Sequence, residues 1–152
     1  MRLRSRIKRM LRRDALEVSS PRKGRLFVRI AREKLRKTIR RLIKLEGFSH
    51  LSTITGVDIG TEIELIYHLS HKDALISVRL SISKEDSAAS TIVDLIPGAA
   101  LYEREVHDLL GVRFKGNPDL SPLLLPDLWP EDIHPLLKEW TPERISERMR
   151  EE

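Results

Sequence analysis

The sequence predicts an α+β fold in which helices cover one face of a mostly antiparallel sheet. Two neighbouring stretches, 63–69 and 76–82, alternate apolar and polar residues on either side of three polar ones, which is typical of an antiparallel hairpin. A strand pattern at 26–30 and amphipathic helices before and after the hairpin complete the chain order β-α-β-β-β-α. A chain of 152 residues can form one hydrophobic core of this kind.

The elements around the hairpin are predicted from apolar spacing and from the residues that begin or end helices. A helix is expected over about residues 31–46, where leucines and isoleucines recur on one stripe and Gly47 follows. Residues 52–58 are expected to form a strand. A second helix is expected over residues 97–110, because Pro97 suits a first turn and Gly111 is placed to stop the helix.

The first 24 residues are predicted to be a basic arm, and the folded body is predicted to begin near Arg25. Residues 1–44 contain 18 Lys and Arg and three acidic residues, a net charge of +15, whereas residues 45–152 carry −10. Anionic lipid, nucleic acid or an acidic protein surface could each bind this arm, and a solvated, partly disordered terminus is an equal alternative. An amphipathic helix is indicated by the spacing of Leu3, Ile7, Met10 and Leu11.

The C-terminal residues 117–152 are predicted to form an extended arm that ends in a short charged helix after Thr141 and Pro142. Six of the eight prolines lie between residues 118 and 142, a density that excludes a long helix or a central strand. The same stretch is rich in leucine and tryptophan, so it must pack against its own domain or against another protein, and docking on a partner is preferred. The predicted units are therefore an N-terminal arm 1–24, an α+β domain 25–116 and a C-terminal arm 117–152.

Composition excludes several kinds of chemistry. The chain has no cysteine, which removes disulfides, cysteine-ligated iron–sulfur clusters and a thiol nucleophile. No apolar run reaches the roughly 18–20 residues of a membrane-spanning helix, and the glycines form no nucleotide-binding motif. Glutamine is absent and Asn117 is the only asparagine, which together with 34% charged residues is typical of heat-adapted proteins.

Charged residues on the second predicted helix have the spacing of a functional site. On a helix, Glu103 and His107 share a face, and so do Arg104 and Asp108. The first pair could act in catalysis or hold a metal ion, but no third ligand is evident, so a metal site and an enzyme are both disfavoured. The second pair is predicted to form an ion pair that fixes the helix or binds a partner.

The same helix and the residues after it carry a more specific motif. Residues 103–120 have the sequence EREVHDLLGVRFKGNPDL, which closely resembles the signature of the complex I thirty-kilodalton subunit family, the NuoC type. Residues 124–129 (LLPDLW) and 134–136 (HPL) are similar to later motifs of that family, and residues 47–58 and 66–69 match its earlier pattern. The resemblance covers about residues 25–140.

The resemblance implies a hydrophilic, non-catalytic subunit without a cofactor or a metal site, in the peripheral arm of a complex I-like membrane-bound oxidoreductase. Members have an α+β domain and a C-terminal extension that embraces the NuoD-type large subunit, so this subunit and cluster-bearing peripheral-arm subunits are the expected partners. Membrane association would be indirect, at the cytoplasmic face, and no nucleic acid is expected. The residues expected to support or contact a partner are Glu103, Arg104, Glu105, Asp108, Phe114, Pro118, Asp119, Leu120, Leu124, Leu125, Trp129, His134 and Trp140.

The chain departs from respiratory members of the family at three places. Asn117 replaces a histidine, Ser121 and Pro122 replace paired arginines, and residues 137–139 replace an Arg-Lys-Asp sequence. The heat-adapted composition and short chain favour an archaeal assembly, such as a membrane-bound hydrogenase, a sulfane reductase or a formate-hydrogenlyase-like complex. The rival interpretation is an RNA-binding α+β module that uses the basic arm and first helix, although RNA recognition relies on aromatic stacking and 5% of the residues are aromatic.

Overall fold

The structure is a computed structural model, which describes residues 2–151. Both predicted helices, the hairpin, the terminal helix and the amphipathic helix near the N-terminus are present, and a strand that was not expected precedes Arg25. The elements in chain order are α1 (Leu3–Met10), β1 (Ala15–Arg22), β2 (Arg25–Ile30), the 3-10 helix η1 (Arg32–Lys34), α2 (Leu35–Glu46), β3 (His50–Asp58), β4 (Glu62–His71), β5 (Ala74–Ser83), β6 (Ala88–Ser90), α3 (Ala99–Leu110), β7 (Arg113–Lys115) and α4 (Pro142–Arg150).

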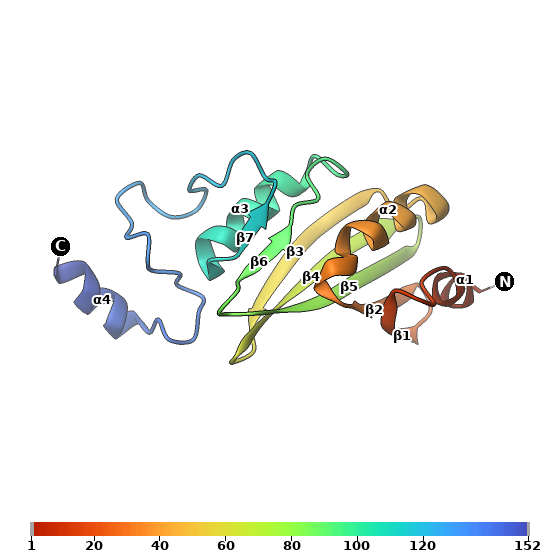
Figure 1. The fold of residues 1–152 in the computed structure, drawn as a ribbon, viewed down its shortest axis with the longest axis horizontal. Helices are drawn as coiled ribbons and strands as arrows, with labels where there is room; N and C mark the ends of the chain where they lie inside the picture. The colour runs from red at the N-terminus through yellow and green to blue at the C-terminus, as the bar shows by residue number, and fades with distance from the viewer. Residues whose placement is uncertain (1, 152) are drawn as a thin grey trace.

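Five strands form one sheet in the order β1-β2-β5-β4-β3, and a short parallel pair of β6 and β7 lies beside it (Figure 1). All neighbours in the large sheet are antiparallel except β2 and β5. The hairpin of β4 and β5 turns through two residues, Lys72 and Asp73, because His71 already pairs with Ala74. The predicted α+β class with a mostly antiparallel sheet is therefore confirmed.

The hydrophobic core lies between one face of the sheet and the helices. Leu35, Ile39 and Leu42 of α2 have no exposed surface and join the alternate inward residues of β2, β4 and β5 in a single cluster. α3 packs closely on the edge strand β3 at Gly56, where a Cβ atom would lie 2.3 Å from Cδ1 of Leu110. The opposite face of the sheet is polar and carries the linked side chains of Arg29, Glu64 and Arg79.

The N-terminal segment is part of the folded body, so the expectation of an arm that ends near Arg25 is wrong for these residues. β1 pairs with β2 along the sheet, and Ile7 and Leu11 have no exposed surface. The apolar stripe of α1 was correctly located in the sequence, but it packs into the core of its own domain. β1 does not alternate regularly between apolar and polar residues. As an edge strand it is held by backbone hydrogen bonds, which do not require such a pattern.

Asp14 fixes this segment to α2. Its buried carboxylate accepts hydrogen bonds from the Lys37 ammonium at 3.0 Å and the Arg41 guanidinium at 3.1 Å. The hydrogen bond from Lys37 lowers the pKa of Asp14 below its ordinary value, against the effect of burial. Arg6 of α1 pairs with Glu46 at the C-terminal end of α2, so the N-terminal segment is held to α2 at two places.

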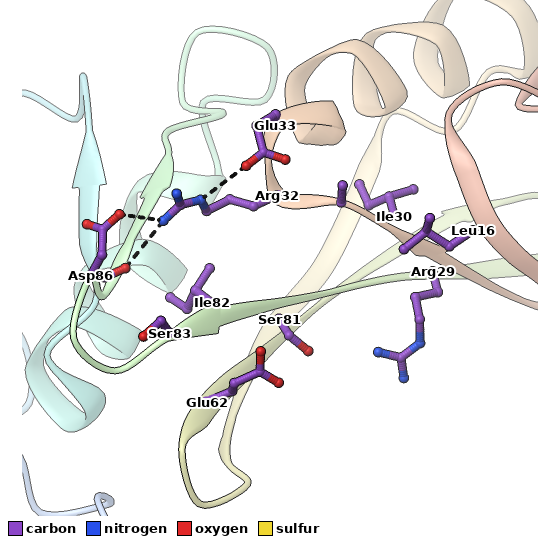
Figure 2. Close-up of a pocket in the computed structure, with 11 residues that line it drawn as sticks. Leu16, Arg29, Ile30, Arg32, Glu33, Glu62, Ser81, Ile82, Ser83 and Asp86 are labelled. Carbon is purple, nitrogen blue, oxygen red and sulfur yellow. Dashed lines mark hydrogen bonds and ion pairs between the residues drawn. The ribbon is translucent and has the colours of Figure 1, made fainter.

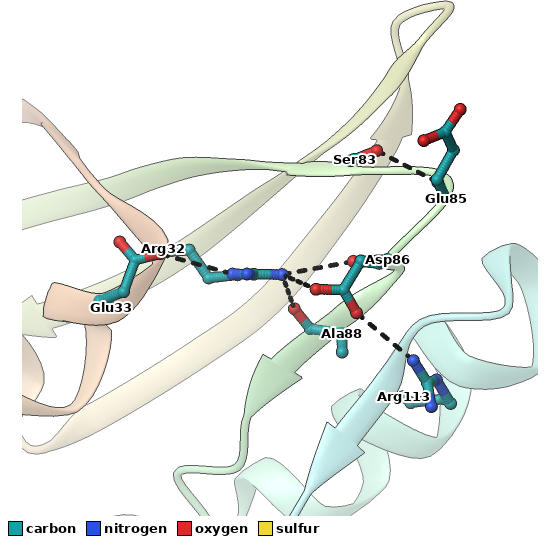
Figure 3. Close-up of polar contacts among 7 residues, drawn as sticks. All are labelled: Arg32, Glu33, Ser83, Glu85, Asp86, Ala88 and Arg113. Atoms are coloured by element: carbon teal, nitrogen blue, oxygen red, sulfur yellow. Dashed lines mark hydrogen bonds and ion pairs between the residues drawn. The ribbon is translucent and has the colours of Figure 1, made fainter.

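Arg32 joins the start of α2 to the segment that leads into β6 (Figure 3). Its Nη1 donates to the Asp86 carboxylate at 2.9 Å, to the Asp86 carbonyl at 3.3 Å and to the Ala88 carbonyl at 3.4 Å. Arg113 of β7 donates to the other carboxylate oxygen of Asp86 at 3.5 Å. These contacts hold the short β6–β7 pair against the main sheet.

Candidate partner-binding surface

The residues of the sequence motif are positioned by α3 and by the turn that ends it. Glu103 and Val106 face the core one helical turn apart, together with Leu110. Gly111 stops the helix with φ at 71°, in the left-handed region that glycine adopts without strain. The chain then reverses through β7 and enters residues 117–152, called the C-terminal segment below.

Glu103 is completely buried and holds three parts of the chain together. Its carboxylate accepts hydrogen bonds from the Thr91 hydroxyl at 2.7 Å, the Ile92 backbone N–H at 2.9 Å and the Asn117 side-chain amide at 2.8 Å. Burial raises the pKa of Glu103 above its ordinary value, and the three hydrogen bonds oppose that effect. Asn117 therefore ties the start of the C-terminal segment to α3.

Arg104 and Asp108 do not pair with each other, so the predicted ion pair is wrong. Both side chains are used by the backbone of the C-terminal segment. Arg104 donates to the carbonyls of Ser121 at 2.9 Å and Pro122 at 2.8 Å. The arginine donors and the aspartate acceptor thus satisfy backbone groups that would otherwise lack partners in a proline-rich stretch.

Asp108 accepts three successive backbone N–H groups through a single carboxylate oxygen, at 2.8 Å from Leu123, 2.8 Å from Leu124 and 3.3 Å from Leu125. Burial opposes ionisation of this carboxyl group, but the three N–H donors outweigh burial and lower the pKa of Asp108. A carboxylate bound in this way prefers one loop conformation, because it can be satisfied only when all three donors point inward. Asp108 is therefore the main anchor of residues 123–125.

Two histidines close the end of α3 against the later part of the C-terminal segment. Nδ1 of His134 donates to the Asp108 carbonyl at 2.9 Å, and Nδ1 of His107 donates to the Val112 carbonyl at 2.9 Å. The His134 ring packs directly over Gly111, which has no side chain to displace it. A cavity of about 490 Å³ remains between the end of α3 and the Trp129 region of the segment.

Asp58 fastens the C-terminal segment at a second place, at the end of β3. Its buried carboxylate accepts the backbone N–H groups of Lys138 and Gly60, at 2.8 Å and 2.9 Å, and pairs with Lys84 at 2.6 Å. Burial alone would raise the pKa of Asp58, but the N–H of Lys138, the Lys84 ammonium and the N–H of Gly60 lower it from 3.8 to about 2. The β3–β4 turn is thereby joined to residue 138.

Acidification is expected to open this contact, because a carboxyl group with a lowered folded-state pKa stabilises the fold only while it is ionised. The contribution of Asp58, on the order of 2 kcal/mol, is complete above about pH 5 and is lost as the pH falls towards 2. Asp58→Asn should therefore speed hydrogen exchange at the Lys138 amide at neutral pH and remove its dependence on acid. Asp127→Asn is the control, because Asp127 is exposed and has no polar partner within residues 2–151; equal exchange in both variants would contradict the prediction.

The candidate residues fall into three groups by exposure, which changes the role of some. Glu103, Asp108 and Phe114 are buried inside the chain, so in this conformation they can support a partner contact through the residues around them but do not face a partner themselves. The half-buried candidates are Arg104, Glu105, Leu120, Leu125, Trp129, His134 and Trp140, and the exposed ones are Pro118, Asp119 and Leu124. The Glu105 side chain has no hydrogen bond or ion pair with any other residue that the structure describes.

Several leucines of the anchored segment, and one of α3, are exposed. Leu128 is 92% exposed, and Leu124, Leu136 and Leu101 are each more than half exposed. Ile133, in contrast, is fully buried, and Leu120 and Leu137 pack on the core, so the segment rests partly on its own domain. Leu101 was not among the predicted site residues, although its position outside the inward stripe of α3 was a signal that it would face outward.

A second cavity, of about 520 Å³, lies at the ends of β2 and β5, away from this surface (Figure 2). Two of its cations are already paired within the chain, Arg29 with Glu64 and Arg32 with Asp86. It shares no residue with α3 or the C-terminal segment.

The structure separates the two residues that the sequence offered as a metal or catalytic pair, because Glu103 turns into the core and His107 bonds to the Val112 carbonyl. Among the residues that the structure describes, no three His, Asp or Glu side chains are grouped so that they could hold a metal ion. Within residues 2–151, no helix has both the length and the apolar character that crossing a bilayer requires.

Comparison with known proteins identifies the family. The sequence model of the family described as the 30 kDa subunit of respiratory-chain NADH dehydrogenase matches residues 28–145, which include α3, Gly111 and most of the C-terminal segment. The chain belongs to this family. The resemblance seen in residues 103–120 is thereby confirmed.

Individual members of the 30 kDa subunit family agree with this assignment. The C-type subunit of the NADH-quinone oxidoreductase of Acidothermus cellulolyticus is 33% identical over 135 residues, which cover 84% of this chain and 69% of that protein. The C/D-type subunit of the NADH-quinone oxidoreductase of Pseudomonas fluorescens is 29% identical over 148 residues, which cover 88% of this chain and 24% of that protein.

A solved structure extends the likeness to the whole fold. This structure is that of the membrane-bound sulfane sulfur reductase, an archaeal respiratory membrane complex. One of its chains matches the present chain with a TM-score of 0.84. The two are 28% identical, and the match covers 97% of this chain and 91% of the other. The likeness therefore includes α1 and β1 at one end and the C-terminal segment at the other.

Proposed function

We propose that this chain is a structural subunit of a complex I-like, membrane-bound oxidoreductase, in which it docks on the large, D-type subunit. The observation that carries the proposal is the group of exposed leucines on a segment that buried charges hold in place. Leu128 is 92% exposed, while Asp108 is buried and accepts the backbone N–H groups of residues 123–125. A solvent-facing loop has no need for this combination, whereas a docking surface requires both apolar contact area and a fixed shape.

The comparisons support a large-subunit partner. The name of the Pseudomonas fluorescens relative joins the C and D types in one protein, and the match to this chain covers 24% of it. Such a fusion is the arrangement expected where the two subunits lie in contact. The likeness to a chain of an archaeal respiratory membrane complex supports an assembly of the same general type.

The role that follows is mechanical support for neighbours that carry electrons. Because the chain has no cysteine, it offers no ligands for a cysteine-bound iron–sulfur cluster, and we infer that clusters belong to adjoining subunits. Electron transfer between fixed centres needs a rigid protein frame, and the hydrogen bonds of Glu103, Asp108 and Asp58 provide rigidity at the docking surface. Attachment to the membrane would be indirect, through the complex, at its cytoplasmic face.

Leu128→Ser is expected to weaken association of the full chain with the D-type subunit of the same complex by about 10- to 100-fold, since burying one leucine contributes roughly 1.5–3 kcal/mol. Leu16→Ser is the matched control, because Leu16 is also exposed, at 71%, but lies on β1. Both variants should melt at the wild-type temperature. The measurement is the dissociation constant in a binding assay with the purified large subunit, and equal affinities for both variants would contradict the proposed docking surface.

A further inference from the structure

The N-terminal end of the molecule has a positive surface that its own carboxylates do not neutralise. The exposed cations of α1, of the turn after it and of α2 together form what we call the basic surface. They are Arg2, Arg4, Lys8, Arg9, Arg12, Arg13, Arg40 and Lys44. None of the eight forms an ion pair with a carboxylate in the part of the chain that the structure describes. The two acids within these same elements, Asp14 and Glu46, are already bound to Lys37, Arg41 and Arg6.

The surface is fixed in shape, because α1 is folded onto α2. Ile7 and Leu11 are fully buried, Leu3 and Met10 pack against the core, and Asp14 joins the two helices. α1 lies at the opposite end of the molecule from α4 and the C-terminal segment (Figure 1). A partner at the basic surface would therefore contact a different side of the chain from the side that carries the exposed leucines.

The cations of α1 surround its exposed side. With about 100° of rotation per residue, Arg4, Lys8 and Arg9 are spread over roughly 140° of the helix circumference, and the apolar stripe with Ile7 lies on the opposite side. A convex rod of charge of this kind can be contacted fully only by a concave surface. A flat bilayer would reach one side of the helix, and the apolar residues that an interfacial helix inserts among lipids are here buried in the core.

Nucleic acid is a poorer fit for a related reason. Binding of single-stranded RNA combines cations with aromatic side chains on which bases stack. Phe27 is the one aromatic residue in the first 46, and it lies on β2 with Arg79 near its ring, away from α1. Arginine forms six of the eight cations, and its planar guanidinium binds carboxylates through two parallel hydrogen bonds, as Arg36 does with Asp94 at 2.6 Å in this chain.

We propose that the basic surface binds a concave, acidic groove on a second protein subunit of the same complex, distinct from the contact made by the leucines of the C-terminal segment. The inference rests on the proposed function, since the neighbour is another subunit of that complex. Carboxylates of the neighbour would neutralise the guanidinium and ammonium groups that lack partners in the chain. The chain would thus be bound at both ends, by apolar contacts at the C-terminal segment and by ion pairs at the basic surface.

The test uses the native complex, purified through a tag on the full chain. The complex is treated with a carbodiimide, which joins lysine amines directly to carboxylates in contact. Lys8 and Lys44 should form crosslinks to Asp or Glu residues of another subunit, whereas Lys115, exposed on β7, serves as the comparison lysine. A combined variant, Arg4→Gln, Arg9→Gln, Arg12→Gln and Arg13→Gln, should associate with the remaining subunits about tenfold more slowly at about 0.15 M salt, because complementary charge speeds encounter by 10-fold or more. A matched variant, Arg22→Gln, Lys23→Gln, Lys72→Gln and Lys115→Gln, removes four exposed cations outside both surfaces and should associate at the wild-type rate.

The outcomes separate the two proposals. An intact complex in which Lys8 and Lys44 form no crosslink to another polypeptide, with wild-type association of the Arg→Gln variant, overturns the acidic groove and leaves the leucine surface standing. Two further assays test lipid and RNA as the ligand: flotation of the chain with phosphatidylglycerol vesicles and a gel shift with generic RNA. Binding in either assay that persists at physiological salt and is lost in the Arg→Gln variant would overturn the acidic groove in favour of lipid or RNA. A chain that co-purifies with no large subunit would overturn the proposed function as well.

Discussion

Replacing Gly111 by alanine is expected to destabilise the fold by about 3 kcal/mol and to loosen the C-terminal segment from α3. Two effects add. Gly111 has φ at 71°, where a side chain costs roughly 1–2 kcal/mol. A Cβ atom there would also lie 2.6 Å from Cδ2 and 2.8 Å from Nε2 of His134, so the ring must move and lose its hydrogen bond to the Asp108 carbonyl.

The measurement is thermal unfolding, in which a loss of this size lowers the Tm by roughly 6–12 °C for a chain of this length. Gly98→Ala is the matched control, since Gly98 has φ at −62° and no atom lies within 4 Å of its Cβ position. That variant should melt within about 2 °C of wild type, because Gly98 has backbone angles that alanine adopts without strain. Equal Tm values for the two variants would show that His134 does not depend on the space above Gly111.

The family motif was located from the sequence, but the roles of its residues were only partly predictable. Helical spacing placed Arg104 and Asp108 on one face and suggested an ion pair between them. In the structure each side chain bonds instead to backbone groups of residues 121–125. A proline-rich segment has few backbone partners of its own, and periodicity contains no information about which distant loop will bring its donors to a helix.

The N-terminal region shows a second limit. The apolar spacing of α1 was evident, yet the same spacing fits a helix that binds lipid, a partner or the core of its own domain. Asp14 favours packing on the chain's own domain, because this carboxylate in an otherwise basic stretch accepts hydrogen bonds from Lys37 and Arg41 of α2. In the sequence it is one of three acidic residues among the 18 Lys and Arg of residues 1–44, whereas in the fold it is one of the contacts that make residues 2–22 part of the domain.

Asp108→Ala is expected to release residues 121–126 from α3 without unfolding the rest of the chain. Three backbone N–H groups lose their acceptor, and each unsatisfied donor costs about 1–3 kcal/mol until water reaches it. Leu123 and Leu124 are partly exposed, so the loop should detach and become hydrated while the core, which does not contain it, remains folded. Hydrogen exchange at the amides of residues 123–125 should rise about 100-fold, which corresponds to roughly 3 kcal/mol.

Glu105→Ala is the matched control for this variant, because Glu105 lies on the same helix, is half-buried and has no polar partner within residues 2–151. Binding of both variants to the D-type subunit distinguishes a positioning role from direct contact. If the buried Asp108 acts by holding the leucines in place, its loss should weaken binding about as much as Leu128→Ser does, although Asp108 itself cannot reach the partner. Wild-type binding by Asp108→Ala, with the exchange of residues 123–125 raised, would mean that the partner orders this loop unaided and that the carboxylate contributes only to the isolated subunit.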